Sequence, residues 1–246
     1  KRFTMSPLRL VTLSLVILGV WLTLRDYFGT WANEYIVRFQ YHAPTREVAQ
    51  WLNQQPEIAD VAIGTNPYQL VLDPAALKLD MNRDIPASWF NAERNVVYAP
   101  SGPTILTALQ PPSAEVRGIL SATAQLQHSF SEFEVYSSVP LPAAMPPADG
   151  DFDQARLKLL DVDGVPNEVH PGDALTWRTN WLVQSPAGQS RLKMFLHVLD
   201  AHGEVIVGDD REDLNFATLS HNTSFWQISQ LTVPGDLPPG QYQVEV

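Results

Sequence analysis

The stretch "MFLHVLDAHGEVIVGDD", from Met194 to Asp210, contains two histidines, three aspartates and one glutamate. Imidazoles and carboxylates at this density are typical of a metal site or an acid/base pair. Alternation gives another interpretation, because Phe195, His197 and Leu199 share one face of a strand and the residues between them occupy the other. Both faces are mostly apolar, which predicts a central strand followed by a hairpin. We therefore interpret His197 as a hydrogen-bonded core group and expect no metal within residues 194–213.

Two further acidic motifs could hold a divalent cation. "DVD", Asp161 to Asp163, has the D-x-D spacing with which nucleotide-sugar transferases bind a metal, but Gly164 follows directly and favours a hairpin turn. "DDRED", residues 209–213, offers several carboxylates for calcium. It lacks the spacing of a calcium-binding loop, which favours a solvated hairpin end.

Motifs for catalysis or cofactor binding are absent from the sequence. Ser101 in "APSGPT" lacks the G-x-S-x-G elbow, neither phosphate-binding glycine motif occurs, and no pair of histidines has metal-ligand spacing. Cysteine is absent as well, which excludes disulfides, thiolate zinc sites and a cysteine nucleophile. We therefore assign no catalytic residue, no metal ligand and no cofactor.

The best candidate for a ligand site is one edge of a predicted sheet. If "VAIG" and "VVYA" are parallel neighbours, "TNP" at residues 65–67 and "PSGP" at residues 100–103 meet at the carboxyl edge of that sheet. Open α/β sheets usually receive ligands at this edge. The alternative is that these Asn, Pro, Ser and Gly residues serve turn formation alone.

Three tryptophans in the C-terminal part of the chain allow two interpretations. Trp177, Trp181 and Trp226 lie in predicted strands, where large aromatic side chains fill a core or cover a sheet edge. The alternative is an exposed aromatic platform on which a sugar ring stacks. The sequence does not say whether these three side chains are exposed.

Composition limits the class of partner. The chain has 246 residues, of which 45% are hydrophobic, which allows one or two domains with buried cores. Its formal net charge is -11. This acidic balance argues against nucleic-acid binding, because contacts with phosphates need a basic face.

The N-terminal segment predicts a membrane helix. Leu10 to Leu24 is uncharged and almost wholly apolar, and Arg9 can snorkel toward the headgroups so that residues 7–8 extend the span. An aromatic belt follows on the far side, formed by Tyr27, Phe28 and Trp31. The lipid bilayer is therefore an expected partner.

Charges around this segment predict its orientation. Lys1, Arg2 and Arg9 make the first nine residues basic, which places the N-terminal side in the cytoplasm and the main domains outside it. The alternative is a secretory signal peptide, but Arg25 and Asp26 stand where small residues should precede a cleavage site. We expect a single-pass cell-membrane protein within this chain.

The rest of the sequence changes from mixed α/β to all-β patterns. Residues 1–30 are the membrane helix and its flanks, and residues 31–139 predict a small α/β domain with a helix in "APTREVAQWLNQQPE". Residues 140–151 contain four prolines and predict a stiff linker. Residues 152–246 contain six predicted strands of an antiparallel β-sandwich, of the immunoglobulin or jelly-roll kind.

Both ends of the chain suggest a longer polypeptide. The chain begins with Lys, although Met5 could be a start, and it stops in the alternating strand "GQYQVEV" with no turn after it. We expect either a piece of a longer protein or an incompletely traced one, with the last strand of the sandwich incomplete.

Several stretches together resemble a known family. The order "HPGDALTWRTNW", "MFLHVLDAHGEVIVGDD", Trp226 and "LTVPGDLPPGQYQVEV" is similar to the C-terminal β-sandwich of bacterial membrane glycosyltransferases of the protein-mannosyltransferase-like kind. Those proteins have a multi-helix membrane body of the C-type fold, a last membrane helix, an outward α/β segment that begins near "YF..W", and this sandwich. "DYFGTW", Asp26 to Trp31, occupies the corresponding place. The family's catalytic acidic residues lie in the first outward loop, near its N-terminus, so none is carried over to this chain.

Two hypotheses for the function follow. The resemblance implies the non-catalytic extracytoplasmic portion of a membrane glycosyltransferase acting on lipid-linked sugars, in contact with acceptor, glycan or neighbouring subunits. The alternative is a single-pass accessory or scaffold subunit of a larger membrane complex. What precedes Lys1 distinguishes them, because further membrane helices and an acidic outward loop would establish the enzyme.

Overall fold

The computed structural model describes residues 6–67, 70, 72–107, 112–138, 151–152, 156–164, 166–185 and 193–246. The chain forms two compact units, Lys1–Pro44 and Thr45–Val246. The first five residues, which include part of the predicted orientation signal, and residues 140–150 of the predicted linker lie outside the described residues.

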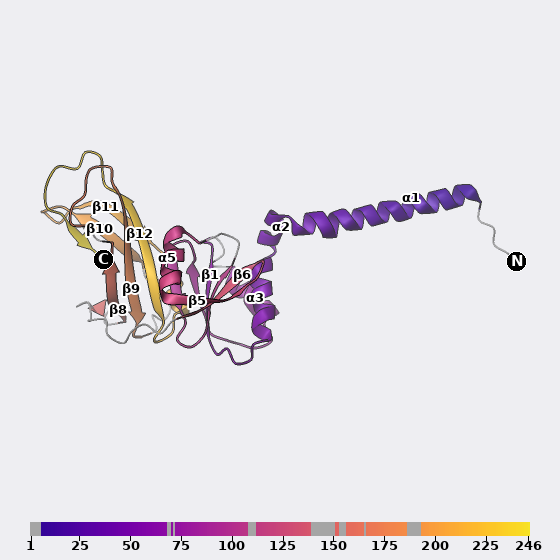
Figure 1. The fold of residues 1–246 in the computed structure, drawn as a ribbon, viewed down its shortest axis with the longest axis horizontal. Helices are drawn as coiled ribbons and strands as arrows, with labels where there is room; N and C mark the ends of the chain where they lie inside the picture. The colour runs from indigo at the N-terminus through magenta and orange to yellow at the C-terminus, as the bar shows by residue number, and fades with distance from the viewer. Residues whose placement is uncertain are drawn as a thin grey trace. The chain divides into compact units, whose positions relative to one another are not determined.

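The first unit is helical (Figure 1). Its helix α1 (Pro7–Leu24) is followed by a π-helical turn (Arg25–Thr30), a 3-10 turn (Trp31–Asn33) and the short helix α2 (Tyr35–Gln40). The helical run 7–33 contains a window with a mean hydropathy of 1.9, and no residue of that window is buried. At 1.5 Å per residue this run is about 40 Å long, which is long and apolar enough to cross a membrane.

The C-terminal end of this run carries the predicted aromatic residues. Tyr27 stacks on Trp31 with ring centroids 4.8 Å apart, and Phe28 meets Tyr27 edge-on at 4.9 Å. The two neighbouring charges neutralise each other, since Arg25 Nη2 lies 2.7 Å from Asp26 Oδ1. The helical run is therefore longer than the predicted Leu10 to Leu24 segment and includes the aromatic belt.

The second unit contains a mixed sheet, sheet A, with the strand order β2-β1-β4-β6-β5. β1 is parallel to β2 and β4, whereas β6 is antiparallel to β4 and β5. The strands of sheet A are β1 (Val61–Thr65), β2 (Ala87–Asn91), β4 (Thr104–Thr107), β5 (Ala124–Ser129) and β6 (Phe133–Ser138). The helices beside it are α3 (Ala43–Asn53), α4 (Asp73–Asp80) and α5 (Ala114–Thr123).

Two antiparallel sheets make up the rest of the unit. Sheet B has the order β3-β12-β9-β8-β7, and sheet C has the order β11-β10-β13. The strands of sheet B are β3 (Asn95–Tyr98), β7 (Asp151–Phe152), β8 (Leu157–Asp163), β9 (Ala174–Val183) and β12 (Ser224–Thr232). Those of sheet C are β10 (Met194–Leu199), β11 (Val205–Arg211) and β13 (Gln243–Glu245), and a 3-10 turn (Phe216–Thr218) precedes β12. All six strands predicted in residues 152–246 are thereby confirmed.

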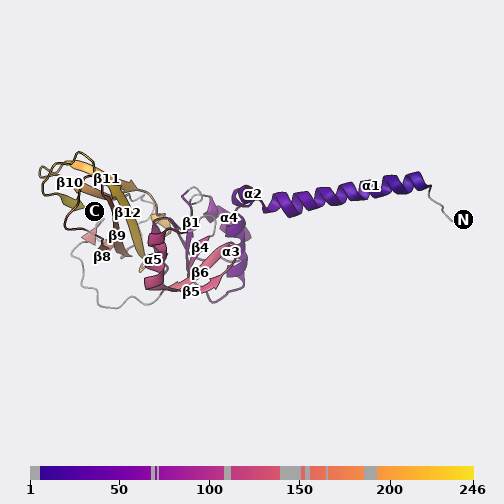
Figure 2. The same cartoon turned by 45° about the horizontal axis from the view of Figure 1, so that its top comes forward.

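Figures 1 and 2 show the helices and sheets of this unit as layers. Buried side chains hold these layers together. One cluster joins α3 and α4 to one face of sheet A, with Leu52 and Trp89 among its members. A second and larger cluster joins the other face of sheet A to α5 and sheet B, with Phe90 and Phe225 as examples. Sheets B and C share a third cluster, formed by Trp177, Leu196, Val198 and Leu231. Because β1 is covered on both faces, all five of its residues are buried.

Strand β3 departs from the predicted division of the chain. It lies in sequence among the strands of sheet A, yet it pairs antiparallel with β12 at the edge of sheet B. An isolated bridge between Phe90 and Leu214 adds a second link. The segments predicted as separate domains, 31–139 and 152–246, therefore share one core from Thr45 onward. A short run buried on both faces, such as "NVVY", does not identify its partner strand, which is why the sequence did not reveal this pairing.

Candidate functional site

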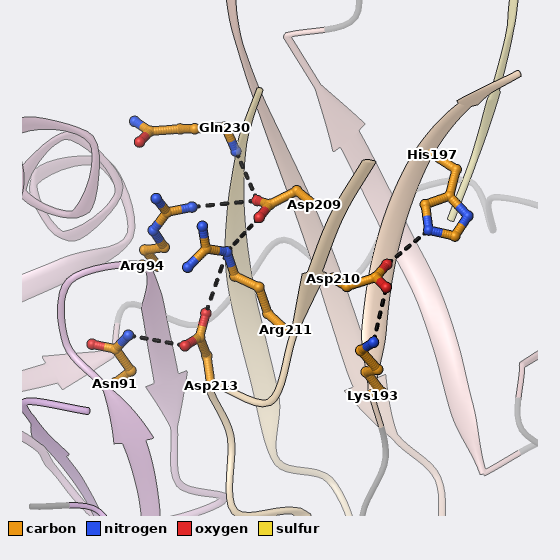
Figure 3. A network of polar contacts seen from close by, with 9 residues as sticks. All are labelled: Asn91, Arg94, Lys193, His197, Asp209, Asp210, Arg211, Asp213 and Gln230. Atoms are coloured by element: carbon orange, nitrogen blue, oxygen red, sulfur yellow. Dashed lines mark hydrogen bonds and ion pairs between the residues drawn. The ribbon is translucent and has the colours of Figure 1, made fainter. Parts of the chain in front are cut away.

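The acidic residues of the β10–β11 hairpin point to two different faces of sheet C (Figure 3). Asp210 is on the outer face, where its carboxylate contacts Lys193 Nζ at 2.8 Å and His197 Nε2 at 2.7 Å. These hydrogen bonds, that of Lys193 first, hold the pKa of Asp210 below its ordinary value. His197 also stacks on Phe195, with ring centroids 4.7 Å apart.

The position of His197 corrects the sequence interpretation in one respect. β10 is the central strand of sheet C, as predicted. Only the face that carries Leu196 and Val198 is buried, however, and the His197 side chain is 23% exposed on the opposite face. It is therefore a hydrogen-bonded surface residue rather than a core residue, because sheet C is covered on one side only.

Asp209 is the buried member of the acidic pair, with an exposed fraction of 7%. Its carboxylate accepts hydrogen bonds from Arg94 at 3.3 Å, Arg211 at 2.6 Å and the backbone N–H of Gln230 at 3.0 Å (Figure 3). Arg211 also lies 3.9 Å from Asp213, which accepts a bond from Asn91. A buried carboxylate held by two guanidinium groups and an amide is a structural joint.

The geometry around "DVD", Asp161 to Asp163, favours the interpretation of this motif as a hairpin turn. Asp163 pairs with Arg178 at 2.9 Å, and Gly164 adopts a φ of +87 that a turn requires. Among the described residues, no group of three or more acidic or histidine side chains is placed to hold a metal ion. The expectation that no metal binds within residues 194–213 stays a prediction, which elemental analysis of the purified protein can test.

The predicted ligand edge is not formed. "TNP" follows β1 at its carboxyl end, but the strands beside β1 are β2 and β4, and neither is the strand of "VVYA". "PSGP" precedes the parallel strand β4, so it lies at the amino end of the sheet, where it contacts Asp60. The two loops therefore lie at opposite edges of sheet A, because the chain leaves this sheet to form β3 in sheet B.

The three tryptophans of the C-terminal strands are core residues. Trp177 and Trp181 are each 2% exposed and Trp226 is 8% exposed. Trp181 stacks on Phe225, with ring centroids 6.4 Å apart. The first interpretation is confirmed, and the alternative of a sugar platform on these side chains is wrong.

Other aromatic side chains do reach solvent, in a place that the sequence analysis missed. Trp51 on α3 lies near His128 at the end of β5 and near Phe130 just after it, with ring centroids 6.2 and 6.5 Å away. Phe130 is 42% exposed and stacks on the buried Phe133 at 4.5 Å. We call Trp51, His128, Phe130 and the concave surface beside them the aromatic site. The alternation of His128 and Phe130 in "HSF" is the signal that could have indicated it.

A β-bulge in the edge strand β5 helps to form this site. Leu126 pairs with Tyr136 and His128 pairs with Val135, so Gln127 has no residue opposite it. Bulges re-aim side chains and are frequent near binding sites. Gln127 Nε2 donates to Ser137 Oγ at 2.9 Å, which fixes the bulged residue on the neighbouring strand.

Arg83 fixes one rim of the aromatic site. Its guanidinium donates to the carbonyl oxygens of Gln55 at 2.7 Å and Ile58 at 2.9 Å, and it reaches Leu52 near the end of α3 at 3.4 Å. A cation is favourable at a helix C-terminus, where carbonyl groups lack partners within the helix. The loop that carries Glu57 is thereby held by side-chain to backbone bonds.

Asp60 fixes the opposite rim. Its carboxylate accepts bonds from the hydroxyl of Ser101 at 2.5 Å and from the backbone N–H of Gly102 at 2.6 Å. A Cβ on Gly102 would lie 1.6 Å from the carbonyl oxygen of Asp60, so only glycine permits this approach. Two loops from different parts of the sequence are therefore locked at the amino end of sheet A.

The hollow of the aromatic site is open to solvent, has a volume of about 370 Å³ and lies beside Phe130 rather than being lined by it. Its surface combines aromatic rings with a carboxylate, amides and hydroxyls, from Trp51, Gln55, Glu57, Ser101, Gln127 and His128. Among the described lining residues, Glu57 is the one carboxylate, and none is Lys or Arg. Neither Gln55 nor Glu57 has a side-chain hydrogen bond with another described residue. Such a surface can accept hydrogen bonds beside a flat apolar face.

A larger groove of about 880 Å³ lies at one end of sheets B and C. Two of its polar side chains, Tyr242 and Asp200, are engaged in local turns. Tyr242 donates its hydroxyl to the carbonyl of Pro238 at 2.6 Å, and Asp200 accepts the N–H groups of His202 and Glu204. Hydrogen bonds from these two N–H groups, that of Glu204 first, lower the pKa of Asp200.

Comparison with known proteins gives no relative: no family model, no curated protein and no solved structure matches the chain. The chain is therefore not assigned to a family. Its function has to be inferred from the order of its elements and from the chemistry of its sites.

Proposed function

We propose that this chain is the non-catalytic extracytoplasmic portion of a bacterial membrane glycosyltransferase that acts on lipid-linked sugars. In this proposal the helical run 7–33 anchors the chain in the cell membrane, with its N-terminal side in the cytoplasm. The unit Thr45–Val246 lies outside and contacts acceptor, glycan or neighbouring subunits.

One observation carries the proposal, namely the succession of elements along the chain. A helix of membrane length is followed by a mixed α/β sheet and then by antiparallel sheets. This is the order of the last parts of the protein-mannosyltransferase-like enzymes that the sequence resembles. The stretches that carry the resemblance form β9, the β10–β11 hairpin and β12, in that order.

Packing supports a finer description of the antiparallel part as a β-sandwich. Trp177 and Leu231 of sheet B share a buried cluster with Leu196 and Val198 of sheet C. Two antiparallel sheets that bury their facing side chains in this way define the sandwich architecture. Sandwich domains present loops and edges to partners while the sheets stay rigid, which suits a contact-forming role.

The test uses the complete gene product in its native membrane. Deleting the gene should abolish transfer of a radiolabelled sugar from a polyprenyl-linked donor in isolated membranes, and the complete gene should restore it. The intact mass should exceed that of the 246-residue chain, because the enzyme needs a multi-helix membrane body. A mass that corresponds to a start at Met5, with transfer unaffected by the deletion, would instead support the single-pass accessory subunit.

A further inference from the structure

We propose that the aromatic site binds a pyranose ring of a neutral glycan. Trp51, which lines the hollow, contacts the apolar face of the ring, Phe130 extends the aromatic surface beside it, and Glu57 and Gln55 bind the hydroxyl groups of the ring. This inference deepens the proposed function, on which it rests for the presence of glycan beside the chain.

The rings of the site suit a sugar in their arrangement. A pyranose presents C–H groups on its faces and hydroxyl groups around its rim. An aromatic face is electron-rich and attracts such C–H groups, in the same way as it attracts the edge of another ring. Trp51 lines the hollow and meets the buried Phe133 edge-on, with ring centroids 6.1 Å apart, so its stacking surface is held rigidly.

The polar groups of the site suit the rim of the sugar. The Glu57 carboxylate can accept hydrogen bonds from two hydroxyl groups, and the Gln55 amide can both donate and accept. Neither side chain has a hydrogen bond to another described residue, so binding breaks no existing bond. A surface that offers both acceptors and donors next to an apolar face matches the vicinal hydroxyl groups of a sugar.

The charge of the residues that line the aromatic site favours a neutral ligand. Among the described residues that line the site there is a carboxylate, Glu57, and no Lys or Arg. The chain as a whole carries a formal charge of -11. A phosphate or a uronic acid would therefore meet repulsion without a compensating cation.

The site is organised before any ligand arrives. Arg83 holds the loop that carries Gln55 and Glu57, Asp60 holds Ser101 and Gly102, and the bulge at Gln127 is fixed by Ser137. Fixed loops lower the entropy lost on binding. The volume of about 370 Å³ is at the lower end of the usual range for small-molecule sites, which suits one or two sugar rings.

The test uses the full chain in lipid nanodiscs, with neutral oligosaccharides of the mannose, glucose and galactose series as probes. Saturation-transfer NMR should show binding of at least one series. Trp51→Ala and Glu57→Gln, at two residues that line the hollow, should each weaken the Kd by roughly tenfold. Phe195→Ala is the matched control, because Phe195 is 37% exposed and also lies against a histidine, but on sheet C. This control should leave the Kd unchanged.

The outcomes separate this inference from the proposed function. Absence of binding by every neutral series up to about 10 mM, or equal binding by the wild type and both variants, would overturn the inference. Binding of acidic sugars alone, or of a protein partner alone, would also overturn it. If Trp51→Ala unfolds, the test rests on Glu57→Gln, because Glu57 is exposed and does not belong to the core. If gene deletion abolishes sugar transfer but the aromatic site binds no glycan, the proposed function stands and this inference fails. If the site binds glycan but the deletion has no effect on transfer, only the proposed function is overturned.

Discussion

Arg94, in the turn before β3, donates to the buried carboxylate of Asp209 on β11 at 3.3 Å, and the two residues lie 115 positions apart in the sequence. This contact joins the segment between β2 and β3 to sheets B and C. Arg211 and the backbone N–H of Gln230 complete the shell around the carboxylate. The joint therefore links parts of the chain that the sequence pattern assigns to different domains.

Asp209 and its neighbour Asp210 give a matched pair of variants. Asp209→Asn leaves two guanidinium groups without their carboxylate in a buried place, so it should lower the free energy of unfolding by about 3 kcal/mol. Asp210→Asn affects an exposed, solvent-screened cluster and should lower the free energy of unfolding much less than Asp209→Asn does. Urea denaturation of both variants measures the difference. Equal effects would show that the Arg94 contact is not a structural joint.

The unit from Thr45 to Val246 should unfold in one transition. β3 is part of sheet B, and one buried cluster includes residues of sheets A and B, so neither part keeps its core without the other. Ile105→Ala in sheet A and Ile228→Ala in sheet B should lower the same melting temperature. Calorimetry of the full chain is the measurement, and two separate transitions, each sensitive to one variant, would contradict this expectation.

The contact of Asp210 with Lys193 and His197 should make stability depend on pH in the acid range. Because these hydrogen bonds lower the pKa of Asp210 in the folded state, their contribution is present above the unfolded pKa of about 3.9 and is lost as the pH falls through the folded value. The difference in unfolding free energy between the wild type and Asp210→Asn should therefore be present at about pH 5 and shrink below about pH 4. A difference that grows on acidification would be inconsistent with a lowered pKa.

The helical run 7–33 should anchor the chain in the membrane. In spheroplasts, added protease should digest the unit from Thr45 onward while the membrane stays intact. Leu15→Arg places a charge in the middle of the run and should weaken insertion by about 3 kcal/mol, so that more of the chain is released by alkaline washing. Tyr35→Arg, outside the run, serves as the control. An intact mass that lacks the apolar segment would support the signal-peptide alternative.

The sequence predicts the individual helices and strands of this fold better than it predicts which strands pair with each other. The helix at Ala43–Asn53 and the long strand Ala174–Val183 are confirmed, because their periodic patterns are long and have clear stops such as Pro56. Strands β2 and β4 were missed, since each has only four or five residues and no alternation. The partner of β3 was also missed, because pairing across sheets depends on contacts between distant residues.

The candidate site was harder to predict than the fold. The tryptophans that the sequence offers as candidates, Trp177, Trp181 and Trp226, are buried, whereas no pattern in the sequence singles out Trp51. The reason is physical: exposure of an aromatic ring depends on which layer covers it. The aromatic site also needs the bulge at Gln127, and a single extra residue in a strand leaves no pattern in the sequence.

The placement of β3 sets an order of events during synthesis. Val96 and Val97 pair with Trp226 and Phe225, so β3 lacks its partner until the chain beyond Phe225 has been made. A contact of such high sequence separation forms slowly, and meanwhile the apolar strand is open to wrong pairing. β3 therefore remains unpaired while the whole segment between β3 and β12 is being made, and its docking completes sheet B.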